Sequence, residues 1–218
     1  MLKISVYPGQ MGWMRMSAMS DATEQACRLC LVAPPEGAAA ATLAWIGEAA
    51  SGGDIASLIV PPGAPVDKAC IALAQRNGIA VVWAGDTPPR GVDGVQVSAS
   101  GAPAARHTHD IVGIDDIHTR HDAMTAAEVD PDYLFFGRFD ATGDLINPAA
   151  LDLAAWWASV AVVPGVVMGG RSLDSVRQAA EAGIEFVALG SAIWDDPRGP
   201  AVAVSEANGI FAAPGVAA

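Results

Sequence analysis

Lysine is nearly absent from this chain of 218 residues, in which acidic side chains outnumber basic ones by 24 to 12. Only Lys3 and Lys68 occur, and the formal net charge is −12. A protein that binds nucleic acid needs clustered lysine and arginine, because the phosphates of the partner repel an acidic surface. We therefore expect no nucleic-acid partner. A small anionic ligand would have to be held by arginine, hydroxyl and backbone N–H groups.

Cysteine and long apolar runs are also scarce. The three cysteines, Cys27, Cys30 and Cys70, form no even set of disulfide partners, which favours a reducing, cytoplasmic location. No apolar stretch approaches the ~18 residues that a membrane-spanning helix needs. The first residues lack the basic-then-apolar order of a signal peptide. We expect a cytoplasmic protein without membrane association.

The sequence does contain a regular alternation of element types. From about residue 28, short apolar runs rich in β-branched residues alternate with alanine-rich helical stretches, which is typical of parallel strands joined by crossover helices. We expect a single-domain α/β protein with a (βα)8 TIM-barrel fold over residues 26–210. Residues 1–25 are expected to form a poorly ordered N-terminal extension, and residues 211–218 a C-terminal tail.

The expected elements follow from these runs. The strands are Leu29–Ala33, Ile55–Val60, Ile79–Trp83, Gly94–Val97, Ile111–Ile114, Tyr133–Gly137, Val163–Met168 and Phe186–Leu189. The helices are Ala38–Ala50, Pro65–Asn77, Thr119–Val129, Ala149–Ser159, Leu173–Ala182 and Ala201–Ala207. The links on either side of the fourth strand are too rich in proline or too irregular to predict a helix.

Two of the expected strands lead directly into glycine and hydroxyl residues. The seventh strand is followed by Gly169 and Gly170, and the eighth by Gly190 and Ser191. Glycine allows backbone N–H groups to approach an anion without a Cβ in the way, and a helix N-terminus adds a favourable dipole. The loops after strands 7 and 8 commonly bind phosphate in TIM barrels. The sequence therefore predicts a phosphate site here, with Ser172 as the N-cap of the next helix.

Polar side chains also follow the fifth and sixth strands, on the face where barrel active sites are assembled. A histidine at the position of His118 can transfer protons near neutral pH, and Asp116 can orient its ring or bind a cation. The alternative role of Asp116 is to cap the following helix. Arg138 is the cation placed for an anionic ligand group, or else a solvated loop arginine.

All four histidines lie close together in the sequence, with spacings that metal ligands also show. His107 and His109 precede the fifth strand, whereas His118 and His121 follow it. Because a strand rises ~3.3 Å per residue, it separates the two pairs of histidines by more than about 10 Å. We expect that no single ion is held by all four.

Several motifs together resemble the thiamine phosphate synthase/TenI superfamily, from about residue 94 to residue 200. They are Asp93-Gly94-Val95-Gln96-Val97, Ile117-His118-Thr119, Asp132-Tyr133-Leu134-Phe135-Phe136-Gly137, Val167-Met168-Gly169-Gly170 and Ala188-Leu189-Gly190-Ser191-Ala192-Ile193. The resemblance implies a (βα)8 barrel that binds thiazole phosphate at Gly169, Gly170, Gly190 and Ser191. In the synthase branch, it also implies that Mg²⁺ helps pyrophosphate to leave. His118 matches the histidine that the TenI branch uses in thiazole tautomerisation.

Several charged positions of the synthase branch are absent from this chain. The cationic second strand of the family is replaced by Ser57–Pro62, its metal-binding Asp after the fourth strand by Ser98–Gly101, and its lysine loop by Asp140–Asp144. Asp86 is the remnant of an Asn-Asp pair and hence the candidate ligand for Mg²⁺. Because departing pyrophosphate needs charge stabilisation, these losses argue against Mg²⁺-dependent synthase chemistry.

Three functions stay open, each on a phosphorylated small molecule such as thiazole phosphate or thiamine phosphate. The first is a divergent thiamine phosphate synthase, in which Arg138, Asp86 and Mg²⁺ replace the lost groups. The second is a TenI-like thiazole tautomerase that uses His118. The third is a non-catalytic barrel that binds a phosphorylated precursor or a partner protein. The missing cations favour the second and third, in thiamine biosynthesis or salvage, and a homo-oligomer is compatible with the sequence.

Overall fold

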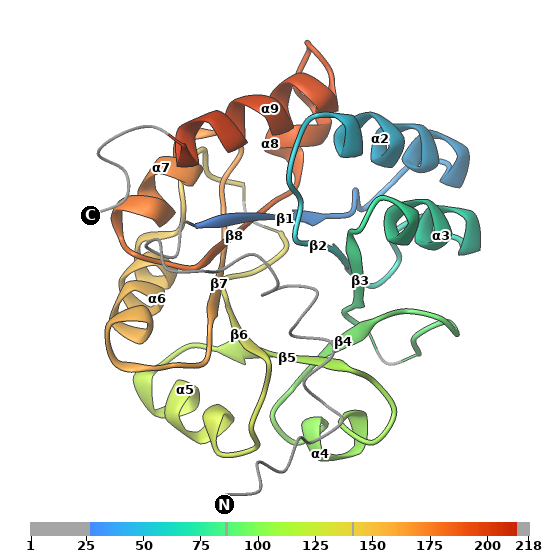
Figure 1. The fold of residues 1–218 in the computed structure, drawn as a ribbon. Helices are drawn as coiled ribbons and strands as arrows, with labels where there is room; N and C mark the ends of the chain where they lie inside the picture. Colours follow the sequence, from blue (N-terminus) through green and yellow to red (C-terminus); the bar gives the residue numbers. More distant parts are fainter. Residues whose placement is uncertain (1–26, 86, 141, 213–218) are drawn as a thin grey trace, which may run out of the picture.

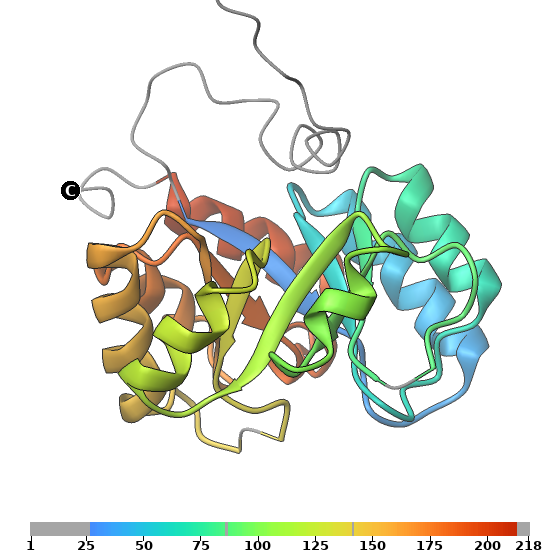
Figure 2. The ribbon, with the colours of Figure 1, turned by 90° about the horizontal axis from the view of Figure 1, so that it is seen from below.

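The computed structural model describes residues 27–85, 87–140 and 142–212. Eight parallel strands close into a barrel in the order β1 to β8, with β8 pairing back onto β1. The helices lie outside the strands and surround them (Figure 1), and a view turned by 90° shows the same two layers (Figure 2). The predicted single-domain (βα)8 barrel is therefore confirmed.

The observed elements occur in the predicted order. The strands are β1 (Arg28–Val32), β2 (Ser57–Val60), β3 (Ala80–Trp83), β4 (Gly94–Val97), β5 (Ile111–Ile117), β6 (Tyr133–Phe136), β7 (Gly165–Met168) and β8 (Phe186–Leu189). The helices are α2 (Ala39–Ser51), α3 (Lys68–Arg76), α4 (Ala102–Ala105), α5 (Arg120–Ala127), α6 (Pro148–Val160), α7 (Asp174–Glu181), α8 (Ser191–Trp194) and α9 (Pro200–Phe211). The short helices α4 and α8 were not predicted, because four residues are too few to show a helical period.

The strands are apolar on both faces because both faces are covered. One set of side chains, which includes Phe135 and Met168, forms a separate cluster that fills the inside of the barrel. The alternate set, which includes Leu134 and Val167, packs against the helices. This is why the strands read as continuous apolar runs in the sequence.

Helix α7 begins one residue later than predicted. Leu173 occupies the N-cap position without a side-chain hydrogen bond, so the prediction of Ser172 as the cap was wrong. The Ser172 hydroxyl instead accepts the N–H of Asp174 at 3.1 Å. The helix ends at Glu181, one residue before the predicted end, and Gly183 follows the Ala182 C-cap with φ of +71°, a conformation that glycine adopts without strain.

The end of β5 departs from regular pairing. Its register with β6 shifts between Ile114 and Ile117, which leaves a bulge at Asp115 and Asp116. Asp116 has φ of +63°, a left-handed conformation that is uncommon for residues other than glycine. A bulge changes the direction of side chains and is common next to active sites.

At the opposite, amino-terminal end of the barrel, acidic residues join the strands in pairs. Asp93, Asp132 and Glu185 lie just before β4, β6 and β8, and each accepts a backbone N–H from the strand before it. The donors are Val81 at 2.8 Å, Val112 at 2.7 Å and Gly165 at 2.9 Å. Before β2, Asp54 forms an ion pair with Arg28 of β1 at 2.8 Å. These contacts are far from the carboxyl ends of the strands, where barrel sites are built.

The ends of the chain bear on the predicted domain bounds. The N-terminal extension at residues 1–25 lies outside the described residues, as does the tail beyond residue 212. Helix α9 includes Phe211, so helical structure continues one residue past the expected end of the barrel. No helix in the described part of the chain is long and apolar enough to cross a membrane.

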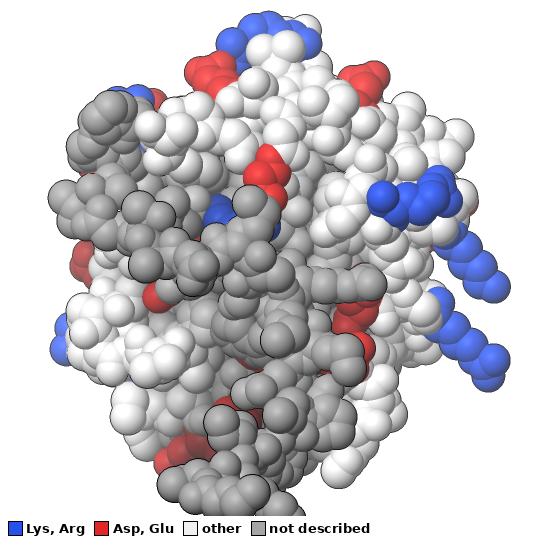
Figure 3. Space-filling view, in the orientation of Figure 1, with Lys and Arg blue, Asp and Glu red and all other residues white. Residues whose placement is uncertain are grey.

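The basic side chains are unevenly placed on the face shown in Figure 3. Where described residues are visible, lysine and arginine lie mainly at the edge of this face.

Candidate functional site

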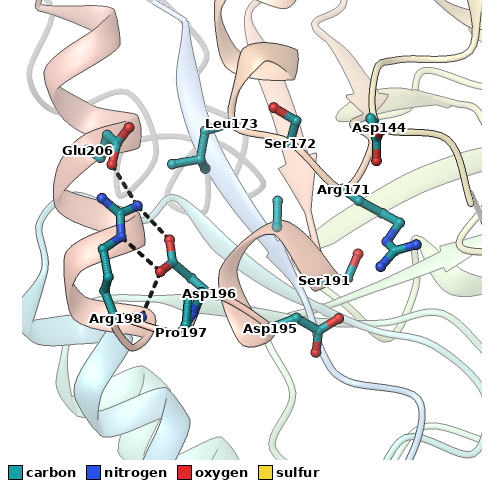
Figure 4. Close-up of a pocket in the computed structure, with 11 residues that line it drawn as sticks. Asp144, Arg171, Ser172, Leu173, Ser191, Asp195, Asp196, Pro197, Arg198 and Glu206 are labelled. Carbon is teal, nitrogen blue, oxygen red and sulfur yellow. Dashed lines mark hydrogen bonds and ion pairs between the residues drawn. The ribbon is translucent and has the colours of Figure 1, made fainter.

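The segments that follow β7 and β8 line one pocket of about 400 Å³ (Figure 4). Its walls are formed by Asp144, Arg171, Ser172, Leu173, Ser191, Ala192, Asp195, Asp196, Pro197, Arg198 and Glu206. The Gly-Gly turn directly precedes Arg171, and the Gly-Ser turn opens helix α8. The structure thus brings the two predicted turns to the same end of the barrel, where Ser191 of one turn and Arg171, which follows the other, line one pocket.

The N–H groups of the Gly-Gly turn are already used inside the protein. Gly169 donates to the carbonyl of Ala188 at 2.8 Å, and Gly170 donates to the buried Ser175 hydroxyl at 2.8 Å. These bonds fasten the end of β7 to β8 and to α7. The sequence predicts that backbone N–H groups of both turns bind one anion. The N–H groups of Gly169 and Gly170 are not available for this, because each already has an acceptor within the protein.

The loop after β6 lies directly over the Gly-Gly turn. The N–H groups of Arg171 and Ser172 donate to the carbonyls of Gly143 and Asp144, both at 2.9 Å. A Cβ on Gly170 would lie against the backbone of Asp144, so that only glycine fits beneath this loop. The Gly-Gly turn thus serves close contact between two loops, and this contact fixes the position of Arg171.

Helix α8 supplies the N–H groups that can face a ligand. The first N–H groups of a helix have no intrahelical acceptor, and those of Ser191 and Ala192 begin α8 on the wall of the pocket. Gly190 precedes them, and a Cβ at this position would meet no atom closer than Val32 at 3.8 Å. The open space at Gly190 leaves room for an anionic group to approach the helix start.

Arg171 is the cation next to these groups, and it is not among the site residues predicted from the sequence. Its exposed side chain extends beside Ser191 in the close-up, and it forms no ion pair with a described residue (Figure 4). Arg198, at the other end of the pocket, is held by Asp196 at 2.7 Å and Glu206 at 2.8 Å. The hydrogen bond with Asp196, and then that with Glu206, raises the pKa of the Arg198 guanidinium. An arginine directly after a strand-end Gly-Gly pair was the available sequence signal.

Arg138, the cation chosen from the sequence, is paired with a neighbouring carboxylate. Its guanidinium donates to both carboxylate oxygens of Asp140, at 2.9 and 3.0 Å. These hydrogen bonds raise the pKa of Arg138 and lower that of Asp140. Both side chains are exposed, so water screens the pair, yet the positive charge is already countered locally.

His118 and Asp116 lie together. His118 Nε2 is 2.8 Å from Asp116 Oδ1, and both side chains are exposed at the carboxyl end of β5. The alternative role of Asp116 as a helix cap is wrong, because Thr119 and Asp122 form a reciprocal capping box at the start of α5. The Asp116 carboxylate can therefore hold the orientation of the imidazole ring.

The histidine and Arg138 line a second cavity, of about 1010 Å³, beneath the loop after β6. This cavity meets the first pocket at Asp144, which lines both, while the glycines of the Gly-Gly turn line neither. His107 and His109 precede β5, as predicted, and line neither cavity. His118 and Arg138, both predicted on the active face, thus line one cavity, and Arg171 and Ser191 line the adjoining pocket.

The described residues contain no ready-made cluster of metal ligands. No group of three or more histidine, cysteine, aspartate or glutamate side chains within them is arranged to hold a metal ion. After β4, where the resemblance implies a carboxylate, the hydroxyls of Ser98 and Ser100 bind each other at 3.1 Å. Asp86, the predicted ligand, lies outside the described residues.

Comparison with known proteins gives a consistent result. A family model described as thiamine monophosphate synthase matches residues 29–193. The thiamine-phosphate synthase of Rhodospirillum centenum is 30% identical to this chain, over 85% of this chain and 98% of its own length. That of Hyphomonas neptunium is 32% identical, over 84% of this chain and 93% of its own length.

Two solved structures share the fold. Thiamine phosphate pyrophosphorylase from Pyrococcus furiosus has a TM-score of 0.67 at 18% identity, covering 85% of this chain and 95% of that chain. A 3-hexulose-6-phosphate synthase has a TM-score of 0.63 at 23% identity, covering 83% and 98%. With its barrel and its paired strand-end turns, the chain belongs to the thiamine monophosphate synthase family.

Proposed function

We propose that this protein binds a phosphorylated thiazole in the pocket of Arg171 and the start of α8, and acts in thiamine biosynthesis or salvage. The observation that carries the proposal is that Arg171, Ser191 and Ala192 line one pocket at the carboxyl ends of β7 and β8. A guanidinium, a hydroxyl and the free N–H groups of a helix start are the groups that bind phosphate esters. The names of the relatives support the ligand class.

We further propose that the half of the site that would bind a leaving pyrophosphate is depleted. Pyrophosphate departs with several negative charges, and cations or a metal ion must neutralise them. Arg138 and Arg198 are already bound to carboxylates, and no three metal-ligating side chains are grouped together among the described residues. The protein thus keeps the means to bind one phosphate group but has few free charges for a second.

Replacing Arg171 with alanine should weaken binding of thiazole phosphate about 10- to 100-fold, since it removes a charged hydrogen-bond donor. Isothermal titration calorimetry measures the change, and Arg171→Lys should retain part of the affinity because it keeps the charge but not the planar fork. Arg138→Ala is the control, for it removes another exposed arginine, one that does not line this pocket. Unchanged affinity in Arg171→Ala, or an equal loss in Arg138→Ala, would place the phosphate elsewhere.

The second candidate function is a tautomerase-like proton transfer on the thiazole. It is favoured by one observation, the 2.8 Å contact between His118 Nε2 and Asp116 Oδ1. A carboxylate in this position fixes the ring of a histidine that takes up and returns a proton.

This candidate predicts that His118→Asn lowers the rate of thiazole tautomerisation about 10²- to 10⁴-fold, the usual contribution of a positioned acid or base. Nuclear magnetic resonance in D₂O follows the reaction by the entry of solvent deuterium into the ring. Asp116→Asn should cause a smaller loss, and neither change should alter the affinity for thiazole phosphate measured by calorimetry. Absence of exchange with the unaltered protein would eliminate this function.

A further inference from the structure

A chain of hydrogen bonds inside the barrel leads from a buried tyrosine to a carboxylate at the carboxyl end. The Tyr133 hydroxyl donates to Gln96 Oε1 at 2.8 Å, and Gln96 Nε2 donates to Asp115 Oδ2 at 3.3 Å. Tyr133 and Gln96 are only 4% and 2% exposed, whereas Asp115 is half-buried. Burying a hydroxyl and an amide is costly unless they have partners, and here the partners converge on one carboxylate.

The elements around this chain are shaped to accommodate it. A Cβ on Gly113 of β5 would lie against the ring of Tyr133, so the glycine leaves the space that the ring occupies. The bulge in β5 begins immediately after Ile114 and sets the direction of Asp115. The neighbouring interior residues Phe135 and Val166 are apolar, as a barrel interior usually is.

Among the described residues, no cation is paired with the carboxylate at the end of this hydrogen-bonded chain. Asp115 forms no ion pair within the described residues, and the amide of Gln96 is its side-chain donor. Burial, and then the charge of Asp116, raises the pKa of Asp115, while the hydrogen bond from Gln96 opposes the rise. A carboxylate in these surroundings is stabilised when a cation or an N–H donor is brought to it.

We propose that Asp115 determines ligand specificity, by selecting phosphorylated heterocycles with a positive charge or an N–H donor over neutral ones. The inference rests on the proposed function, because the phosphate must sit at the ends of β7 and β8 for the ring to extend across the barrel mouth. The thiazolium of thiamine phosphate carries a charge that neutral thiazole phosphate lacks, so thiamine phosphate is the preferred ligand. Gln96 and Tyr133 are positioning residues that hold the carboxylate.

The test compares three probes by calorimetry: thiamine phosphate, neutral thiazole phosphate and inorganic phosphate. Asp115→Asn should weaken binding of thiamine phosphate about 10-fold or more, because an interaction with a charged group is lost. Its affinity for the other two probes should change less than about twofold, since neither offers a cation. Glu181→Gln removes an exposed carboxylate at the end of α7 that lines neither cavity, and is the matched control, with no change in selectivity expected.

Two further measurements separate specificity from a structural role. Tyr133→Phe keeps the ring but removes the donor to Gln96, and should reduce the preference for thiamine phosphate without affecting inorganic phosphate. Asp115→Asn should raise the thermal midpoint of unfolding. Since the pKa of Asp115 is raised in the folded state, its ionised form opposes folding at neutral pH, and its removal relieves this.

The outcomes distinguish this inference from the function on which it rests. Equal weakening of all three probes by Asp115→Asn, or unchanged selectivity, would overturn the role of Asp115 alone. A lowered midpoint of unfolding would assign the residue to the fold instead. Failure of the unaltered protein to bind any of the three probes would refute the phosphate pocket, and the specificity inference would fall with it.

Discussion

Supplied with pyrimidine diphosphate, thiazole phosphate and Mg²⁺, the purified protein should release pyrophosphate at least about 10²- to 10³-fold more slowly than an ordinary synthase. Loss of a single preorganised charge-stabilising group typically costs this factor. Here Ser98–Gly101 offer no carboxylate for a metal, and the loop after β6 carries Asp140 and Asp144 instead of a lysine. A coupled assay for pyrophosphate measures the rate, with a thiamine-phosphate synthase of the same family assayed in parallel.

Turnover equal to that of the parallel enzyme would contradict this expectation. It would mean that Arg138, Asp86 and Mg²⁺ replace the lost groups, as the first hypothesis from the sequence holds. Arg138→Ala would then decide the matter, because abolition of activity by this change alone would identify the residue that neutralises pyrophosphate. In the structure, Nε and Nη2 of Arg138 both donate to the Asp140 carboxylate. Arg138 would have to break these hydrogen bonds to bind pyrophosphate through the same two nitrogens.

Replacing Gly170 with alanine should displace the loop after β6 and weaken thiazole phosphate binding about 10-fold or more. The new Cβ would contact the backbone of Asp144 and lie 2.6 Å from the carbonyl oxygen of Gly143. Backbone atoms cannot move aside as a side chain can, so overpacking of about 1–3 kcal/mol is expected. For a chain of this size, that lowers the midpoint of unfolding by about 3–10 °C. Arg171 loses its place as well, since its N–H is bound to the displaced loop.

Gly190→Ala is the matched control for that experiment. Its Cβ would have no neighbour closer than 3.8 Å, so differential scanning fluorimetry should give an unchanged midpoint. The added methyl group stands beside the first N–H groups of α8, and calorimetry should show weaker phosphate binding. An unchanged midpoint for Gly170→Ala would contradict the close contact of the two loops. Full phosphate affinity in Gly190→Ala would contradict the binding role of α8.

The fold was predictable because most strands are apolar runs that end at a turn signal. The exception is β5, which continues through Asp115 and Asp116 to Ile117, past its predicted end at Ile114. The site was predictable only in part. Gly169, Gly170, Gly190 and Ser191 were chosen for their positions at strand ends, and those positions follow from local sequence. The acceptors of the N–H groups do not follow from local sequence. Gly169 donates to the carbonyl of Ala188 on β8, and Arg171 and Ser172 donate to carbonyls of the loop after β6. The alignment of Gln96 with Asp115 depends on the register between β4 and β5, which no single-strand pattern reveals.

The acidic residues at the amino ends of the strands divide the barrel into four consecutive units. Asp54, Asp93, Asp132 and Glu185 each bind the strand immediately before them, so that β1 is joined to β2, β3 to β4, β5 to β6 and β7 to β8. Contacts within a unit are close in sequence and can form early in folding, whereas the pairing of β8 with β1 spans the chain and carries the largest loop-closure cost. New termini introduced between β4 and β5 would leave every one of these bonds within a continuous segment. Such a circular permutant keeps all four units whole, whereas a cut between β5 and β6 separates Asp132 from the N–H that it binds.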